Sequence, residues 1–202
     1  MARNTNKLKS LKKGSAEEIT RLNNVDKQLI IELYYFGHET QGQVLQVLAK
    51  SRVGRALKTY LKEDVVTRRG GNSIYSYSLN SNGRDIAETL LGLPKENLYR
   101  AQNVIHDAPL VAYARENLSA NELRNIITEE EQKRMIINHP NYDPTKEYSA
   151  CDFGYRGDDG GLYFIESEGD KYTKEMIQAK KNTAELLGGE YIGFKAREFW
   201  SR

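Results

Sequence analysis

The sequence predicts an α+β protein, in which a helical first domain ends in a β-hairpin and a small α/β domain follows. Two patterns carry the prediction. Apolar residues recur at helical spacing from Asn24 to Glu63, and two short strands around a glycine turn come next. A strand, turn, strand, helix, strand order then occupies residues 149–194. We therefore expect a basic tail, a first domain, a linker and a second domain at residues 1–19, 20–92, 93–104 and 105–202.

The distribution of charge supports two domains with different roles. Residues 1–105 hold 17 Lys and Arg against 10 Asp and Glu, whereas residues 106–202 hold 13 against 18. A basic half indicates contact with a polyanion such as DNA. The single cysteine cannot form an internal disulfide, and no apolar run is long enough for a membrane span. These features predict a cytoplasmic protein without a membrane partner.

The first domain is expected to contain four helices and one hairpin. The first helix begins at a capping Asn24 and ends at Gly37, and apolar residues 44–48 lie on a short second helix. Ser51 is placed to cap a third helix that runs to Glu63. Residues 64–69 and 74–79 read as two strands joined by the turn at residues 70–73, and a last helix runs from about Ser81 to Gly92.

This order of elements resembles the winged helix-turn-helix superfamily over residues 20–92, with the hairpin as the wing. The segment Tyr77–Arg84 is similar to the superfamily's Y-x-L-T-x-x-G step, with Asn80 in place of the usual Thr. The resemblance implies binding of double-stranded DNA through the third helix. A protein–protein module is the alternative, because many members of the superfamily bind proteins instead.

The third helix would present a basic face to a DNA groove. If Val53, Leu57 and Leu61 face the core, the opposite face carries arginines that suit bidentate pairing with guanine and lysines that suit phosphates. Basic residues of the hairpin surround its glycine turn and could enter the minor groove. The residues expected to contact DNA are Ser51, Arg52, Arg55, Lys58, Thr59, Lys62, Arg68, Arg69 and Asn72.

In the second domain, two acidic residues fall at the ends of adjacent predicted strands. Asp152 lies in the strand predicted at residues 149–153, and Glu166 ends the strand predicted at residues 162–166. A helix at residues 172–187 and a strand at residues 191–194 follow. Paired carboxylates of this kind can bind a catalytic metal ion.

This segment resembles the P-D…(D/E)-x-K pattern of the restriction-nuclease superfamily. Together with His106-Asp107 and the sequence Phe-Ile-Glu-Ser-Glu-Gly, it also resembles the replication-relaxation proteins of plasmids and conjugative elements. The resemblance implies Asp152 and Glu166 as metal ligands and one of Glu129, Glu130 or Glu131 as an earlier carboxylate. Glu168 stands where the nuclease lysine is expected, and Lys180 or Lys181 of the next helix could reach the site instead.

Two functions from different classes follow. The first is a cofactor-free, homodimeric, sequence-specific DNA-binding protein of a plasmid, phage or conjugative element, which acts in replication, transfer or transcription control. The second is a Mg²⁺-dependent DNA endonuclease that the winged helix targets, with Asp152, Glu166 and Lys180 as its catalytic residues. Glu168 in place of lysine favours the first. His38, His106 and His139 show no metal-ligand spacing, so none is assigned to catalysis.

Overall fold

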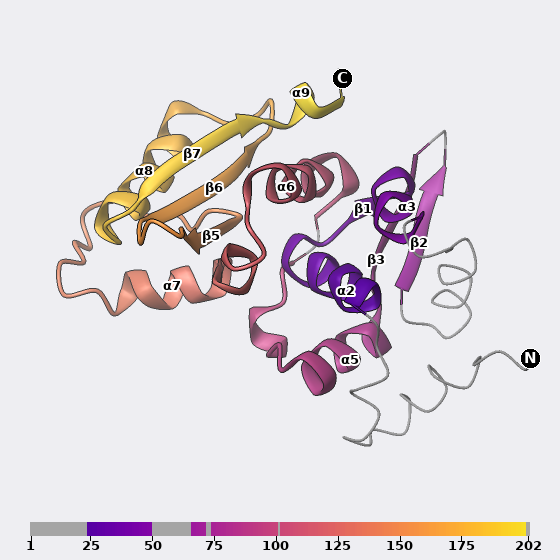
Figure 1. Cartoon of the computed structure of the whole chain (residues 1–202). Coiled ribbons are helices and arrows are strands. Elements are labelled where there is room, and N and C mark those ends of the chain that lie inside the picture. Colours follow the sequence, from indigo (N-terminus) through magenta and orange to yellow (C-terminus); the bar gives the residue numbers. More distant parts are fainter. Residues whose placement is uncertain (1–23, 50–65, 72–73, 101, 201–202) are drawn as a thin grey trace, which may run out of the picture. The chain divides into compact units, whose positions relative to one another are not determined.

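The computed structural model shows an α+β chain that divides into two compact units, residues 1–104 and 105–202 (Figure 1). The boundary follows Val104, the first residue of a helix that belongs otherwise to the second unit. The structure describes residues 24–49, 66–71, 74–100 and 102–200.

The first unit combines helices with a three-stranded antiparallel sheet of order β1-β3-β2. Its helix α2 buries Leu29, Ile30, Leu33 and Tyr34, a spacing that places all four on one helical face. Its described elements are α2 (Asn24–Phe36), β1 (Glu39–Thr40), α3 (Gln41–Ala49), β2 (Val66–Gly71), β3 (Ile74–Leu79), α5 (Ser81–Leu91) and the 3₁₀ helix η2 (Lys95–Asn97).

The predicted hairpin and last helix of this unit are confirmed. Strands β2 and β3 pair from Val66↔Leu79 to Gly71↔Ile74, so the strand extends through the glycines that the sequence assigned to the turn. Asn80 is the N-cap of α5, and its side chain accepts a hydrogen bond from Gly83 N at 2.9 Å. The helix ends at Leu91, and the C-cap residue Gly92 has a positive φ of 66°. In this conformation its N–H donates to the carbonyls of Ala87 and Glu88 in the final turn.

The second unit is built on a four-stranded mixed sheet of order β4-β5-β6-β7. Neighbours are antiparallel except β6 and β7, which are parallel because helix α8 connects them. Its described elements are α6 (Val104–Asn117), η3 (Glu122–Arg124), β4 (Ile126–Thr128), α7 (Glu129–Ile137), β5 (Phe153–Arg156), β6 (Leu162–Glu168), α8 (Lys174–Leu186), β7 (Glu190–Lys195) and α9 (Ala196–Trp200).

Helices cover both faces of this sheet. On one face, Tyr113 of α6 stacks on Phe194 of β7, with ring centroids 5.4 Å apart. On the other face, a core cluster joins α7, α8 and β6, consisting of Ile136, Cys151, Phe164, Ala184 and Leu187. Alternate residues of β6 therefore face α6 and α8.

The acidic residue Asp152 lies just before a strand rather than inside one. The strand predicted at residues 149–153 is wrong in position, because β5 begins only at Phe153. In the residues that precede β5, backbone amides bond to side chains and not to a neighbouring strand. Ser149 N donates to Thr183 Oγ1, and Cys151 N donates to Gln132 Oε1. Helix α8 starts two residues later than predicted, after the N-cap Thr173.

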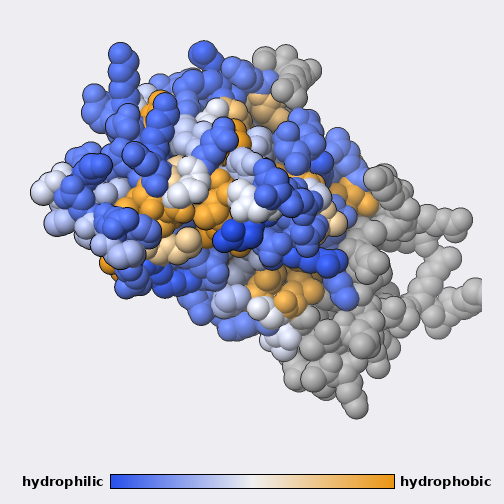
Figure 2. All heavy atoms as spheres, turned by 60° about the vertical axis from the view of Figure 1, so that its left-hand side comes forward, coloured by the Kyte–Doolittle hydropathy of each residue, from blue (hydrophilic) through white to orange (hydrophobic). Residues whose placement is uncertain are grey.

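Hydrophilic side chains dominate the face in Figure 2, around a smaller apolar area. The large apolar side chains that remain most exposed among the described residues are Ile137, Ile105 and Met176. No helix within the described ranges has the length and hydropathy to cross a membrane.

Candidate metal-binding and catalytic site

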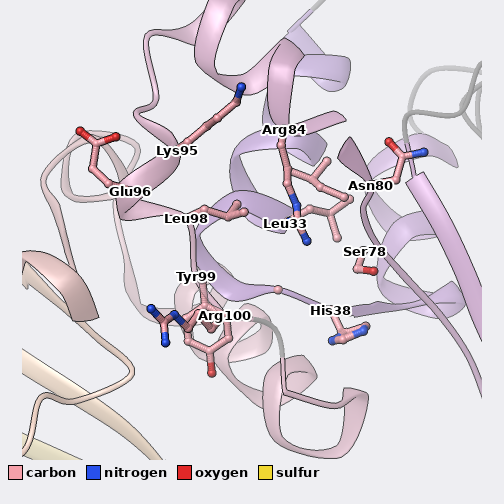
Figure 3. A pocket seen from close by; sticks show the side chains of 12 residues that line it. Leu33, His38, Ser78, Asn80, Arg84, Lys95, Glu96, Leu98, Tyr99 and Arg100 are labelled. Carbon is pink, nitrogen blue, oxygen red and sulfur yellow. The ribbon is translucent and has the colours of Figure 1, made fainter. Parts of the chain in front are cut away.

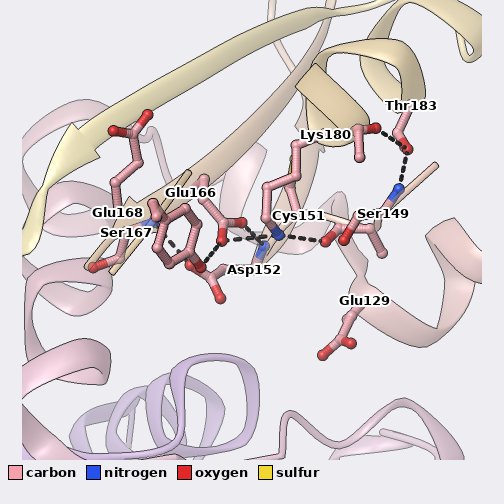
Figure 4. A network of polar contacts seen from close by, with 12 residues as sticks. Glu129, Ser149, Cys151, Asp152, Glu166, Ser167, Glu168, Lys180 and Thr183 are labelled. Atoms are coloured by element: carbon pink, nitrogen blue, oxygen red, sulfur yellow. Dashed lines mark hydrogen bonds and ion pairs between the residues drawn. The ribbon is translucent and has the colours of Figure 1, made fainter. Parts of the chain in front are cut away.

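Asp152 and Glu166 are brought together by the pairing of β5 with β6 (Figure 4). Phe153 pairs with Ile165, so the preceding Asp152 stands opposite Glu166. Two hydrogen bonds lock this contact: Asp152 N donates to Glu166 Oε2 at 2.9 Å, and Ser167 N donates to Asp152 Oδ2 at 2.8 Å. Both carboxylates are buried, Glu166 completely. Each is therefore fixed by backbone groups rather than by flexible surface contacts.

Lys180 of α8 reaches the same carboxylate. Its Nζ lies 2.9 Å from Glu166 Oε1 and donates to Ala150 O at 2.8 Å. The hydroxyl of Tyr172 also donates to Glu166 Oε1. The neighbouring Lys181 is exposed and lies over an aromatic ring of β7. Of the two lysines that the sequence offered, Lys180 is the one beside the carboxylates.

His106 of α6 completes the cluster, a role that the sequence did not reveal. Its Nε2 lies 3.5 Å from Asp152 Oδ2, and its Nδ1 lies 3.1 Å from Asp107 Oδ1. Asp107 is fully buried. Because 46 positions separate His106 from Asp152 in the chain, no local spacing could have signalled this contact.

The start of α6 is held in place by two side chains that bond to its carbonyls. Pro109 has no N–H, so it cannot donate to Ile105 O, four residues earlier. The indole of Trp200 donates to Ile105 O at 3.1 Å instead, and Ser167 Oγ donates to His106 O at 3.1 Å. These bonds fix the helix turn that carries His106 against β6 and the C-terminal helix.

The cluster perturbs the proton affinity of its members. Burial and the negative charge of Glu166 raise the pKa of Asp152 to about 7, against the opposing effects of His106 and Lys180. Burial lowers the pKa of His106, but its bond to Asp107 and the charge of Asp152 outweigh burial, and the net shift is upward. Burial likewise opposes the charge on Lys180, and Glu166 raises its pKa overall. Asp152 therefore takes up or releases its proton near neutral pH.

The donor set suits a divalent metal ion. One ligand atom each from His106, Asp152 and Glu166 lies within 4.8 Å of the other two. Atoms bound to one ion at about 2.1 Å lie about 3–4 Å apart, so small side-chain movements would close the site. An imidazole nitrogen and carboxylate oxygens are both common metal ligands. Asp152 and Glu166 would hold the ion, with His106 within reach.

The acidic run Glu129–Glu131 does not join this cluster. Glu131 forms a capping box with Thr128 at the start of α7, and Glu129 and Glu130 contact Lys133 at 2.7 and 2.8 Å. Figure 4 shows Glu129 apart from the carboxylate network. These acids stabilise helix α7, because negative charge near a helix N-terminus is favourable.

Glu168 is also occupied elsewhere. Tyr191 donates to Glu168 Oε1 at 2.9 Å, and Lys195 of β7 forms an ion pair with its other oxygen. These partners lower the pKa of Glu168 against the effect of burial. The position at which the nuclease pattern has lysine therefore holds an ion pair between β6 and β7.

The residues predicted to contact DNA lie mostly outside the described part of the chain. Seven of the nine are in residues 50–65 and 72–73, and for Arg68 and Arg69 only the backbone, in β2, is described. The DNA interface on the third helix therefore stays a prediction.

The described part of the first unit contains a pocket of about 570 Å³ (Figure 3). Its lining includes Arg84, Lys95 and Arg100 against a single acid, Glu96. Lys95 forms ion pairs with two carboxylates of α5, at 2.9 Å each. The sequence did not single out these cations, which are spread over 17 positions. Because Asp85 and Glu88 offset the charge of Lys95 and Glu96 adds a further acid, the pocket shows no excess of positive charge.

No known protein family, curated protein or solved structure matches this chain. Functional assignment therefore depends on the chemistry of the residues in these two units.

Proposed function

We propose that the protein is a metal-dependent DNA nuclease whose second unit cuts the strand and whose first unit binds the duplex. One observation carries the proposal: Asp152, Glu166 and Lys180 converge from the start of β5, from β6 and from α8. Two carboxylates can hold a metal ion for hydrolysis of a phosphodiester, and a nearby lysine can stabilise the charge that develops on the phosphate.

Each of the three side chains has a distinct role in this proposal. Asp152 and Glu166 would hold the ion, which when bound neutralises charge on the phosphate and favours ionisation of a water molecule. Lys180 offers three N–H donors on one cation, and its bonds to Glu166 Oε1 and Ala150 O aim it at the cluster. A cation in that place can stabilise negative charge that develops on the phosphate.

The lysine supports the proposal in a specific way. Glu168 stands at the sequence position of the expected lysine, and this departure argued against catalysis. Lys180 places an ammonium group beside Glu166 from a different backbone position, so the departure no longer removes the cation from the site. What matters for the chemistry is where the charge lies, not which element carries it.

The first unit would supply affinity for the substrate. The helix expected at residues 51–63, outside the described residues, would offer Arg52 and Arg55, which at a spacing of three residues would share a face. Arg68 and Arg69 of the hairpin would add contacts with phosphates, which carry affinity but no sequence information. The second unit would depend on the basic first unit to reach DNA, because the negative net charge of the second unit opposes its approach to phosphates.

A non-catalytic DNA-binding protein is the second candidate, and one observation favours it. Protein donors already occupy Glu166: Lys180 and Tyr172 at Oε1 and the Asp152 amide at Oε2. A buried carboxylate satisfied in this way can serve structure alone. In that case the cluster would tie α8 to β5 and β6 and would bind no ion.

Incubation with supercoiled and linear DNA distinguishes the two candidates. The nuclease is expected to nick or cut in the presence of Mn²⁺ or Mg²⁺, to stop in EDTA, and to lose cutting in Asp152→Asn. Glu129→Gln is the matched control, because it removes an acid that lies apart from the cluster. A wild-type protein that retards the duplex but never cuts it with either ion would rule out the nuclease and leave the non-catalytic candidate.

A further inference from the structure

We infer that His106 is a ligand of the same metal ion and Asp107 its positioning residue, so that the site prefers Mn²⁺ to Mg²⁺. This inference rests on the proposed function, since it concerns the ion that Asp152 and Glu166 would hold. Its basis is that α6 brings an imidazole, not a carboxylate, to the two acids.

The two ring nitrogens of His106 have different partners. Nδ1 lies 3.1 Å from Asp107 Oδ1, and Asp107 is fully buried. A metal-bound histidine commonly donates its second N–H to a carboxylate, which fixes the ring and its tautomer. With the proton on Nδ1, the lone pair of Nε2 points into the cluster. The local sequence His106-Asp107 thus places a ligand and its support on one helical turn.

The distance from His106 Nε2 to Asp152 Oδ2 fits two ligands of one ion. It is 3.5 Å, longer than the usual 2.7–3.2 Å of an N–H···O hydrogen bond. Two ligand atoms on one ion are about 3–4 Å apart. The backbone that carries the ring is held by Ser167 Oγ at the carbonyl of His106 and by Trp200 at that of Ile105. The ring itself is held by the contact of Nδ1 with Asp107.

The kind of ligand determines the choice of ion. Mg²⁺ prefers oxygen ligands and retains its waters. Imidazole suits transition metals better, and Mn²⁺ is the member of that series that also suits carboxylates. A site of three carboxylates would favour Mg²⁺, but this cluster has two carboxylates and one imidazole. Mn²⁺ accepts both ligand types and is therefore the probe.

The test measures metal binding to the full-length, metal-free protein. Mn²⁺ is followed by electron paramagnetic resonance, and Mg²⁺ by its competition with Mn²⁺. Wild type should bind Mn²⁺ at least about tenfold more tightly than Mg²⁺. His106→Asn retains a donor for Asp107 but withdraws the ligand atom, so Mn²⁺ affinity should fall about tenfold or more while Mg²⁺ affinity changes by about twofold or less.

Two further variants extend the test. One is a second substitution of His106, in case the first does not fold, and the other tests the positioning role of Asp107. His106→Gln places an amide near the position of Nε2, and should lower the ratio of Mn²⁺ to Mg²⁺ affinity even if His106→Asn fails to fold. Asp107→Asn should weaken Mn²⁺ binding about tenfold while circular dichroism stays that of wild type. His139→Asn is the matched control; the His139 ring accepts from Asn141 N, lies outside the cluster and should leave both affinities unchanged.

The outcomes separate this inference from the proposed function. If DNA is cut with metal but the His106 variants bind Mn²⁺ as wild type does, the inference is wrong and the nuclease stands. If Mn²⁺ binds through His106 but no DNA is cut, the inference stands and the nuclease fails. A wild type that binds Mg²⁺ as tightly as Mn²⁺, or binds neither ion, overturns the inference.

Discussion

Lys180 Nζ lies 2.9 Å from Glu166 Oε1, and both side chains are almost entirely buried. This pair joins α8 to β6, one of the two central strands of the sheet, next to Asp152, which directly precedes β5. Removal of one partner from a buried pair leaves a charge that cannot reach water, which costs more than the pair itself contributes.

Lys180→Met should therefore lower the free energy of unfolding by about 3 kcal/mol. The measurement is chemical denaturation of the metal-free protein. The exposed neighbour provides the control, because Lys181→Met should change stability by no more than about 0.5 kcal/mol. The double variant Lys180→Met/Glu166→Leu should recover part of the loss, since neither member of the pair then leaves an unpaired buried charge. Equal stability of Lys180→Met and wild type would show that the pair is not formed.

The pH dependence of stability follows from Asp152. Its pKa is raised to about 7 by burial and by Glu166, against an ordinary value of 3.8. Between these values the folded protein retains a proton that the unfolded chain has released, so the free energy of unfolding falls as pH rises. The raised pKa of His106 acts in the same direction.

In EDTA, we expect this free energy to decline by about 2 kcal/mol between pH 5 and pH 7.5. Carboxylates whose pKa is lowered, such as Glu168, give the opposite slope only at lower pH. Asp152→Asn should flatten the profile, while Glu166, Lys180 and Tyr172 remain around the substituted side chain. If the free energy of unfolding of Asp152→Asn declines with pH as steeply as that of wild type, a group other than Asp152 binds the proton.

Gln132 positions the residue that precedes Asp152. Its side chain is fully buried, accepts from Cys151 N at 2.8 Å and donates to Cys151 O at 3.1 Å. Gln132→Ala leaves both backbone groups without this partner, and should cost about 2–3 kcal/mol of stability. Gln178→Ala, on the exposed face of α8, should cost less than about 0.5 kcal/mol. A similar small effect at both sites would contradict this role of Gln132.

DNA binding should depend on the helix that the sequence predicts at residues 51–63. Arg52→Ala/Arg55→Ala should abolish specific binding without unfolding, because arginine pairs with guanine edges. Arg69→Ala should instead weaken binding to all sequences and reduce the salt slope by about one. Gel retardation at several salt concentrations measures both, with Lys146→Ala of the second unit as the control. A double arginine variant that shifts its target duplex normally would rule out this helix as the reader.

Local signals in the sequence predicted local structure well. Asn80 and Gly92 bound α5 as their cap positions suggested, and alternation of residues 74–79 predicted β3. The strand predicted at residues 149–153 was misplaced, because Ser149 and Cys151 bond to side chains of α8 and α7 instead of to a strand partner. Such partners lie far away in the chain, so no window of sequence contains them.

In the candidate site too, the sequence predicted some contacts and missed others. The proximity of Asp152 and Glu166 could be predicted from the sequence, because adjacent strands bring their end residues together. His106 could not, since its approach depends on how α6 lies on the sheet. Glu131 was misread although its signal was present: Thr128 and Glu131 have the spacing of a capping box, which identifies a helix start rather than a metal ligand.

The most direct test of the account is the single-turnover cleavage of an end-labelled duplex with Mn²⁺. We expect wild type and Glu129→Gln to cut at equal rates, Asp152→Asn and Glu166→Gln to be inactive, and Lys180→Met to be slower by about a hundredfold or more. EDTA should stop every reaction. If Asp152→Asn cuts as fast as wild type, or if wild type bound to DNA cuts with neither Mn²⁺ nor Mg²⁺, then the buried cluster is not a nuclease site.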